Sequence, residues 1–175
     1  MRILKRIAIS LLALIVILAV VGFFLPSHFK VERSAEIAAP AEKIYALIEA
    51  PREWKKWAIW NQRDPTMQIT YSGPEQGQGA AWSWQSKSEG SGSMTFTRAE
   101  APKLIEYKLS FPEFGTTATG KLEFTPTGSG TKISWSNEGD LGINPINRYF
   151  GLMMESWVGK DFEAGLANLK ALAEK

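Results

Sequence analysis

The sequence predicts an α+β protein in which a seven-stranded antiparallel sheet wraps around a long C-terminal helix, preceded by one N-terminal transmembrane helix. Three observations support this: an uncharged apolar run near the N-terminus, a series of short alternating segments separated by Gly, Pro and Ser, and a helical stretch after Asn144-Pro145. The 175 residues, 45% of them hydrophobic, suffice for one domain with its own core.

The N-terminal apolar run is predicted to be a membrane anchor that is not cleaved. No charged residue lies between Ile7 and Leu25. As a helix this run is roughly 28 Å long, close to the thickness of the hydrocarbon core of a bilayer. A cleaved signal peptide is the alternative, but its apolar core is usually shorter and is followed by small residues, whereas this run leads into Pro26.

The charges around this run predict its orientation. Arg2, Lys5 and Arg6 precede it, so the positive-inside rule predicts a cytoplasmic N-terminus and a domain outside, in the periplasm or extracellular space. The chain is thus expected to be a single-pass protein of the plasma (inner) membrane. We assign residues 1–29 to the anchor and linker and residues 30–175 to the folded domain. Beyond the anchor, 17 basic and 18 acidic residues form no basic stripe, which argues against nucleic acid as a partner.

Seven segments alternate apolar and polar residues as half-buried strands do. They run over residues 31–37, 67–71, 80–85, 91–99, 104–111, 116–125 and 131–138. The short turns between the last six predict an antiparallel meander with one apolar face, which must be covered by helices.

Helices are expected before and after this meander in the sequence. Pro40 suits the first turn of a short helix that ends before Pro51, and a compact turn with Trp54, Trp57 and Trp60 follows. Asn144 and Pro145 suit the N-cap and first position of the C-terminal helix. The apolar stripe of this last helix changes direction near Gly159, which predicts a break or bend between Gly151 and Gly159.

This order of elements resembles the START-like helix-grip (SRPBCC) superfamily, which includes polyketide cyclase/dehydrase-like and lipid-transport proteins. The resemblance extends over residues 30–175 and rests on the stretches VERSAEIAAPAEKIYALI, WKKWAIW, GQGAAWSW, TKISWS and DFEAGLANLK. It implies a helix-grip fold with a cavity between the sheet and the long helix. Because this fold serves carriers, cyclases, hydrolases and regulators, it does not by itself predict a function.

The resemblance and the strand alternation together nominate residues that line the cavity. The candidates are Trp82, Trp84, Phe96, Arg98, Tyr107, Phe111, Trp135, Met153 and Trp157. The alternative for the aromatic residues is that they simply fill the core. Arg98 has inward parity and could hold a carboxylate or phosphate, or it could instead reach solvent or pair with a glutamate.

The leading hypothesis is a membrane-anchored domain that binds a hydrophobic small molecule or lipid in an internal cavity. The chain has no cysteine and one histidine, so we expect neither a metal site nor a cofactor, and we assign no catalytic residue. A cyclase, dehydratase or hydrolase acting on an aromatic or polyketide-like substrate is one alternative, with Arg98 or Tyr107 polarising a carbonyl. A non-catalytic interaction module is another, with no particular protein partner predicted.

Overall fold

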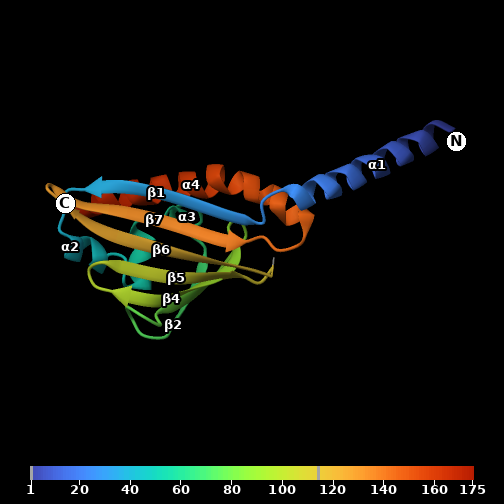
Figure 1. Ribbon diagram of the computed structural model, residues 1–175. Helices are drawn as coiled ribbons and strands as arrows, with labels where there is room; N and C mark the ends of the chain where they lie inside the picture. Colours follow the sequence, from blue (N-terminus) through green and yellow to red (C-terminus); the bar gives the residue numbers. More distant parts are fainter. Residues whose placement is uncertain (1, 114) are drawn as a thin grey trace.

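The computed structural model describes residues 2–113 and 115–175, and it contains the predicted sheet and helices (Figure 1). The helices are α1 (Arg2–Phe24), α2 (Ala41–Ala46), the 3-10 helix η1 (Pro51–Lys56), α3 (Ile59–Arg63) and α4 (Pro145–Ala173). The strands are β1 (His28–Ile37), β2 (Gln68–Ser72), β3 (Ala81–Ser86), β4 (Gly90–Glu100), β5 (Leu104–Phe111), β6 (Thr116–Thr127) and β7 (Gly130–Asp140).

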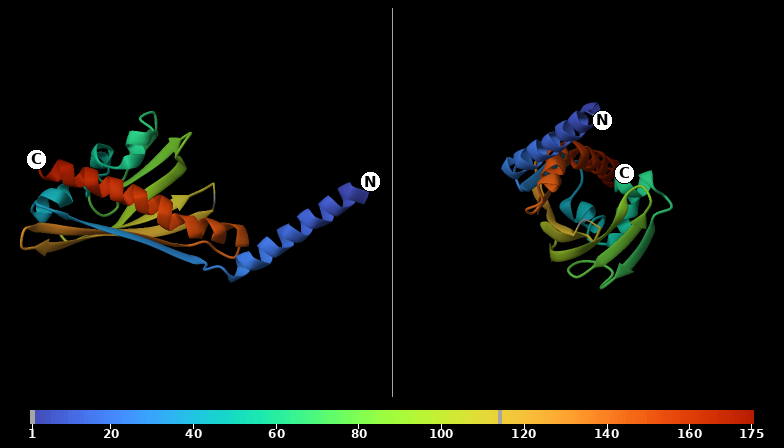
Figure 2. Two further views of the ribbon diagram at one scale, coloured as in Figure 1. Left: turned by 90° about the horizontal axis from the view of Figure 1, so that it is seen from above. Right: turned by 90° about the vertical axis from the view of Figure 1, so that its right-hand side faces the viewer.

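All seven strands form one antiparallel sheet in the order β1-β7-β6-β5-β4-β3-β2. The last six strands are neighbours in sequence and in space, and β1 closes one edge by pairing with β7. The sheet curves around the face that α4 and the short helices cover, as the views in Figure 2 show. The predicted helix-grip architecture is therefore confirmed.

The core lies on the concave face of the sheet, where the strand alternation predicts apolar side chains. Trp57, Trp135 and Phe162 are almost completely buried there, and the rings of Trp135 and Phe162 stack with their centroids 3.9 Å apart. Trp54 and Trp57, from the compact turn after α2, donate their indole N–H groups to the carbonyls of Ile48 and Leu47. The short helices thus fill one end of the core, and their buried indoles are satisfied.

The predicted break in the C-terminal helix is wrong, because α4 is one uninterrupted helix. Its start is as predicted, with the Asn144 side chain accepting a hydrogen bond from the Ile146 backbone N–H. Gly159 has a different role: a Cβ atom there would overlap the Arg33 guanidinium. Arg33 on β1 forms ion pairs with Glu163 at 2.6 Å and with Glu155 at 2.7 Å, both on α4. Gly159 leaves the space that the Arg33 side chain needs to join β1 to α4.

The change in direction of the apolar stripe along α4 is nevertheless present. The C-terminal half buries Phe162, Leu166 and Leu169 against the sheet, whereas the N-terminal half leaves Phe150 and Trp157 exposed. The N-terminal half of α4 contacts α1 instead. Helix α1 projects away from the domain (Figure 1). Helix α1 is long and apolar enough to cross a membrane, and its side chains are almost all exposed.

Candidate functional site

A pocket of about 190 Å³ lies between the concave face of the sheet, α3 and α4. Aromatic and aliphatic side chains make up most of its wall, with a few polar groups among them. The lining residues are Trp54, Ala58, Trp60, Asn61, Met67, Ile69, Trp82, Trp84, Glu89, Met94, Tyr107, Leu109, Phe111, Asn137, Val158 and Phe162. An apolar enclosure with a small number of polar groups is the usual character of a small-molecule site.

The strand register places this pocket toward the end of the sheet that adjoins α1. Phe111 is the last residue of β5 and Asn137 lies close to the end of β7. Asp140, the last residue of β7, pairs with His28 at the start of β1, just after α1. The pocket and the connection to α1 therefore share one end of the domain.

Two glycines allow aromatic rings to lie against neighbouring strands in the pocket wall. Gly92 on β4 is the register partner of Trp84 on β3, and Gly120 on β6 is the partner of Tyr107 on β5. A Cβ atom at either glycine would overlap the ring of its partner. Each aromatic ring thus lies over a glycine, in the space that a side chain would otherwise fill. The rings can therefore form the pocket wall without blocking the pocket.

The floor of the pocket carries two polar groups in one row across three strands. Tyr107, Gly120 and Asn137 are consecutive register partners on β5, β6 and β7. The Tyr107 hydroxyl accepts a hydrogen bond of 2.8 Å from the indole Nε1 of Trp135, which leaves its own proton free to be donated. Asn137 is only 7% exposed, and its Oδ1 atom has no hydrogen-bond partner among the described residues.

These two groups can bind a polar group of a ligand. Burial raises the pKa of Tyr107 well above its ordinary value, so the hydroxyl stays protonated and remains a donor at physiological pH. A buried polar atom without a partner is uncommon in folded proteins, because it costs free energy relative to water. A hydroxyl group both donates and accepts, so it is the ligand group that matches an amide acceptor and a phenol donor in one pocket.

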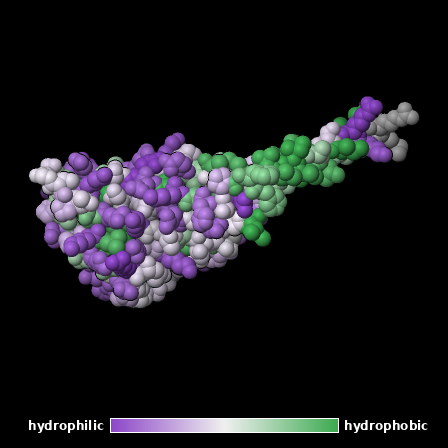
Figure 3. Space-filling view, viewed as in Figure 1, coloured by the Kyte–Doolittle hydropathy of each residue, from purple (hydrophilic) through white to green (hydrophobic). Residues whose placement is uncertain are grey.

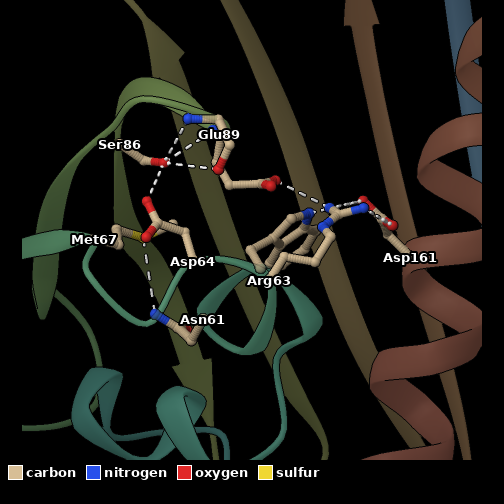
Figure 4. A network of polar contacts seen from close by, with 9 residues as sticks. Asn61, Arg63, Asp64, Met67, Ser86, Glu89 and Asp161 are labelled. Atoms are coloured by element: carbon tan, nitrogen blue, oxygen red, sulfur yellow. Dashed lines mark hydrogen bonds and ion pairs between the residues drawn. The ribbon is translucent and has the colours of Figure 1, made fainter.

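A polar network closes one side of the pocket (Figure 4). Arg63 on α3 contacts Asp161 on α4 at 2.7 Å and Glu89, in the turn between β3 and β4, at 3.0 Å. Trp60 donates its Nε1–H to the same Asp161 carboxylate at 2.8 Å. Hydrogen bonding to Asp161 raises the pKa of Arg63, which keeps its charge. Three separate segments are therefore joined around the pocket.

A second network in the same view ties α3 to β3. Asp64 accepts a hydrogen bond of 2.6 Å from the Ser86 hydroxyl and another from the backbone of Thr66. The bond from Ser86 is the main reason that the pKa of Asp64 lies below its ordinary value. Asn61, which lines the pocket, donates to the Met67 sulfur at 3.8 Å. These contacts fix the short helix that covers the pocket.

Four of the predicted cavity residues line this pocket, namely Trp82, Trp84, Tyr107 and Phe111. Phe96 and Trp135 have the predicted inward orientation, but they are buried in the core beside the pocket. Phe96 packs against Trp82. Trp135 stacks on Phe162 and also contacts Trp54 of η1, Trp57 just after η1 and Trp60 of α3.

The other three candidates lie outside the pocket. The register of β4 shifts at a bulge between Phe96 and Arg98, which turns Arg98 to the outer face, where it pairs with Glu100 and Glu106. Met153 and Trp157 are 40% and 53% exposed on a face of α4 that neither the sheet nor α3 covers. Strict alternation cannot anticipate a bulge, and helical periodicity does not reveal which face remains uncovered.

Asn137, Asn61 and Glu89 line the pocket although sequence reasoning did not nominate them. For Asn137 a signal was present in the sequence. It follows Ile133 and Trp135 at the same parity on the last strand, so it is a polar residue at a position expected to be buried. Asn61 and Glu89 lie outside the predicted strands, where no periodicity indicates orientation.

A larger hollow of about 860 Å³ lies at the ends of β1, β6 and β7. It includes His28, Lys30, Glu138 and Asp140, all of which are exposed to solvent. The enclosed aromatic wall and the unpartnered buried amide belong to the smaller pocket, which is therefore the better candidate. Among the described residues, no group of three or more His, Cys, Asp or Glu side chains is placed to hold a metal ion.

Solved structures with the same fold come from several sources. Protein CV1439 from Chromobacterium violaceum is 19% identical, with a TM-score of 0.57 over 86% of this chain and 99% of that one. Protein MLL2253 from Mesorhizobium loti is 16% identical, with a TM-score of 0.60 over 82% and 95% of the two chains.

The di-domain aromatase/cyclase (ARO/CYC) StfQ from the steffimycin biosynthetic pathway is 16% identical, with a TM-score of 0.62. The match covers 84% of this chain but 51% of StfQ, so this chain spans about half of that protein. No curated protein matches the chain in sequence. The family model described as polyketide cyclase/dehydrase and lipid transport matches residues 28–174. With its seven-stranded sheet, long C-terminal helix and enclosed pocket, the chain belongs to this family.

Proposed function

We propose that this protein is a single-pass membrane protein whose domain holds a small hydrophobic molecule, or part of a lipid, in the pocket beneath α4. The observation that carries the proposal is the buried amide of Asn137, which lines the aromatic enclosure together with Tyr107 and whose Oδ1 has no hydrogen-bond partner among the described residues. A side chain that only filled the core at this position would be more stable if it were apolar. A polar group kept there favours a ligand over simple packing.

The pocket limits the size and chemistry of this ligand. A cavity of about 150 Å³ lined by apolar side chains can hold a benzene ring. The 190 Å³ pocket thus suits one ring or an aliphatic group of similar volume. The polar row on the floor favours a hydroxyl on that group, and for a lipid only a segment would enter. A protein that used only its outer surface for interaction would need no such enclosure.

The anchor proposal is supported by the contacts between α1 and the domain. Arg148 donates to the carbonyl oxygens of Phe23 and Leu25, and the Tyr149 hydroxyl donates to the carbonyl of Leu18. Cleavage after α1 would leave these polar groups without their partners. We therefore propose that residues 1–29 remain attached to the domain of residues 30–175. The basic N-terminal end favours an orientation with the domain outside the cytoplasm.

Two probes of nearly equal size test the ligand proposal on the full-length protein in nanodiscs. Toluene and 4-methylphenol differ by one hydroxyl, and tryptophan fluorescence reports their entry because four indoles line the pocket. We expect 4-methylphenol to bind about three- to tenfold more tightly, the equivalent of one net hydrogen bond. This preference should disappear in Asn137→Leu. Equal affinities in the wild-type protein, or no binding of either probe, would contradict the proposal.

A cyclase or dehydratase is the second candidate, favoured by the convergence of Tyr107, Asn137 and Glu89 on one pocket. Tyr107 is held protonated by its environment and could polarise a substrate carbonyl, whereas Arg98 lies on the outer face and could not. Incubation with a β-diketone that carries an ortho-hydroxyphenyl group tests this candidate: the phenol oxygen adds to the distal carbonyl, the resulting hydroxyl leaves as water, and mass spectrometry detects a cyclic product lighter by one water. Product formation that Tyr107→Phe abolishes would favour an enzyme over a carrier.

A further inference from the structure

The N-terminal half of α4 exposes an apolar face, here called the α4 stripe. It consists of Ile146, Phe150, Met153 and Trp157, which are 63%, 51%, 40% and 53% exposed. Their spacing of four, three and four residues places them on one side of the helix. A contiguous exposed apolar surface of this kind marks an interaction site.

The short helices cover α4 only on the C-terminal side of the stripe. Farther along α4, Asp161 contacts Trp60 and Arg63 of α3, and Asn168 donates to the carbonyl of Trp57. No element of the described chain takes this place over the four stripe residues. The domain therefore presents the stripe uncovered at the same end as α1.

The contacts between α1 and α4 indicate what covers the stripe. Tyr149, in the first turns of α4, donates its hydroxyl to the carbonyl of Leu18 at 2.6 Å. A helix rises 1.5 Å per residue, so Leu18 lies roughly 9 Å along α1 before Phe24. A Cβ atom at Gly22 would lie 2.7 Å from Pro145 Cβ, which shows how closely the two helices pack. If α1 spans a bilayer, the start of α4 lies beside the outer part of its apolar segment.

The polar contacts at this junction agree with such a depth. Arg148 donates to the carbonyl of Phe23 at 2.7 Å and to that of Leu25 at 3.1 Å, near the end of α1, where the backbone would otherwise lack partners. Tyrosine and tryptophan favour the boundary between hydrocarbon and headgroups, and Tyr149 and Trp157 lie on either side of this region of α4. Figure 3 shows the hydrophobic surface of α1 continuing onto the adjoining end of the domain.

We infer that the α4 stripe lies in the outer leaflet of the bilayer that α1 spans, as a second contact between the domain and lipid. The inference rests on the proposed membrane anchor. Lipid is the occupant because the stripe continues the exposed apolar surface of α1. The hydrogen bond from Tyr149 to Leu18 places the start of α4 beside the membrane-spanning segment, at the depth of its apolar residues. Val158, next to Trp157, lines the pocket, so one helix carries the lipid contact and part of the pocket wall.

The absence of cysteine makes the test direct, because single cysteines can be introduced without background. Full-length variants Phe150→Cys and Met153→Cys probe the stripe, Ile15→Cys probes the anchor, and Ala167→Cys is the control on an exposed site of α4 far from α1. Each variant is placed at one copy per nanodisc of phosphatidylcholine and phosphatidylglycerol. The rate of modification by a membrane-impermeant maleimide is then measured.

We expect both stripe cysteines to react at least about tenfold more slowly than Ala167→Cys, because burial of a large apolar side chain favours the lipid-inserted state by such a factor. Ile15→Cys should be equally protected. Stripe cysteines that react as fast as the control, with Ile15→Cys protected, would overturn the inference and leave the anchor standing. Rapid reaction of Ile15→Cys would overturn both. Protection that arises only with two copies per nanodisc would identify a second chain as the occupant and contradict the lipid contact.

Discussion

The indole Nε1 of Trp135 donates a hydrogen bond of 2.8 Å to the Tyr107 hydroxyl, and both side chains are buried. This bond satisfies the indole and uses one lone pair of the phenol, so the phenol proton remains free to be donated. Trp135 stacks on Phe162 of α4, and Tyr107 lies in the floor of the pocket, so this hydrogen bond connects the aromatic core to the pocket floor. Its two members should respond differently to substitution.

Trp135 is expected to be a major contributor to stability. Its ring stacks on Phe162 and contacts Trp54 and Trp57 at their edges. Trp135→Ala should lower the free energy of unfolding by about 3–5 kcal/mol, as removal of a buried aromatic side chain does. Chemical denaturation of the full-length protein measures this. The exposed Trp157→Ala is the control and should change stability by less than about 0.5 kcal/mol; a Trp135→Ala protein as stable as wild type would disprove the packing.

Tyr107→Phe should destabilise the protein at neutral pH and change how its stability depends on pH. The variant leaves the Trp135 N–H buried without an acceptor, which costs about 1–3 kcal/mol. Burial raises the pKa of Tyr107 in the folded state, while the unfolded phenol titrates near pH 10. The contribution of the neutral phenol is therefore complete below about pH 10 and is lost as the pH rises further. Denaturation curves from pH 8 to 11.5 should show wild type losing stability more steeply than the variant; parallel curves would contradict this.

Gly120→Ala should disturb the pocket floor, because its Cβ atom would overlap the Tyr107 ring. Overpacking of this kind typically costs about 1–3 kcal/mol. Gly128, in the turn between β6 and β7, has no atom within 4 Å of a Cβ position, so Gly128→Ala is the matched control. Thermal unfolding of both variants checks the prediction, which fails if the two melt at the same temperature.

Asn137→Leu should raise stability while weakening the binding of a ligand that carries a hydroxyl group. The substitution replaces a buried oxygen that has no partner among the described residues by an apolar group of similar size, so about 1 kcal/mol or more should be gained. Asn168 provides the contrast, because its amide donates a 3.1 Å bond to the Trp57 carbonyl, and Asn168→Leu should be destabilising. A drop in stability for Asn137→Leu would indicate that this amide has a structural partner instead of a ligand.

The sequence predicted the architecture well because each strand alternates clearly and each turn carries Gly, Pro or Ser. The orientation of Trp82, Tyr107 and Trp135 followed directly from that alternation. Prediction failed for Arg98, where one extra residue in β4 reverses the orientation of the side chain.

The C-terminal helix illustrates a second limit. The change in direction of its apolar stripe was visible in the sequence, but its cause was not. Gly159 accommodates Arg33, which is far away in sequence, and the stripe stays exposed because no other element in the described part of the chain covers it. The pocket itself depends on pairs such as Tyr107 with Gly120, which become evident only once the strand register is known.

Native mass spectrometry of the full-length protein, released gently from its own membranes, tests the central claim most directly. We predict that the wild-type protein carries a bound small molecule or lipid, and that Asn137→Leu, isolated in the same way and at least as stable, carries much less of it. A folded wild-type protein that is released without any bound molecule, or equal occupancy in the two proteins, would contradict the claim that the pocket beneath α4 is a ligand site.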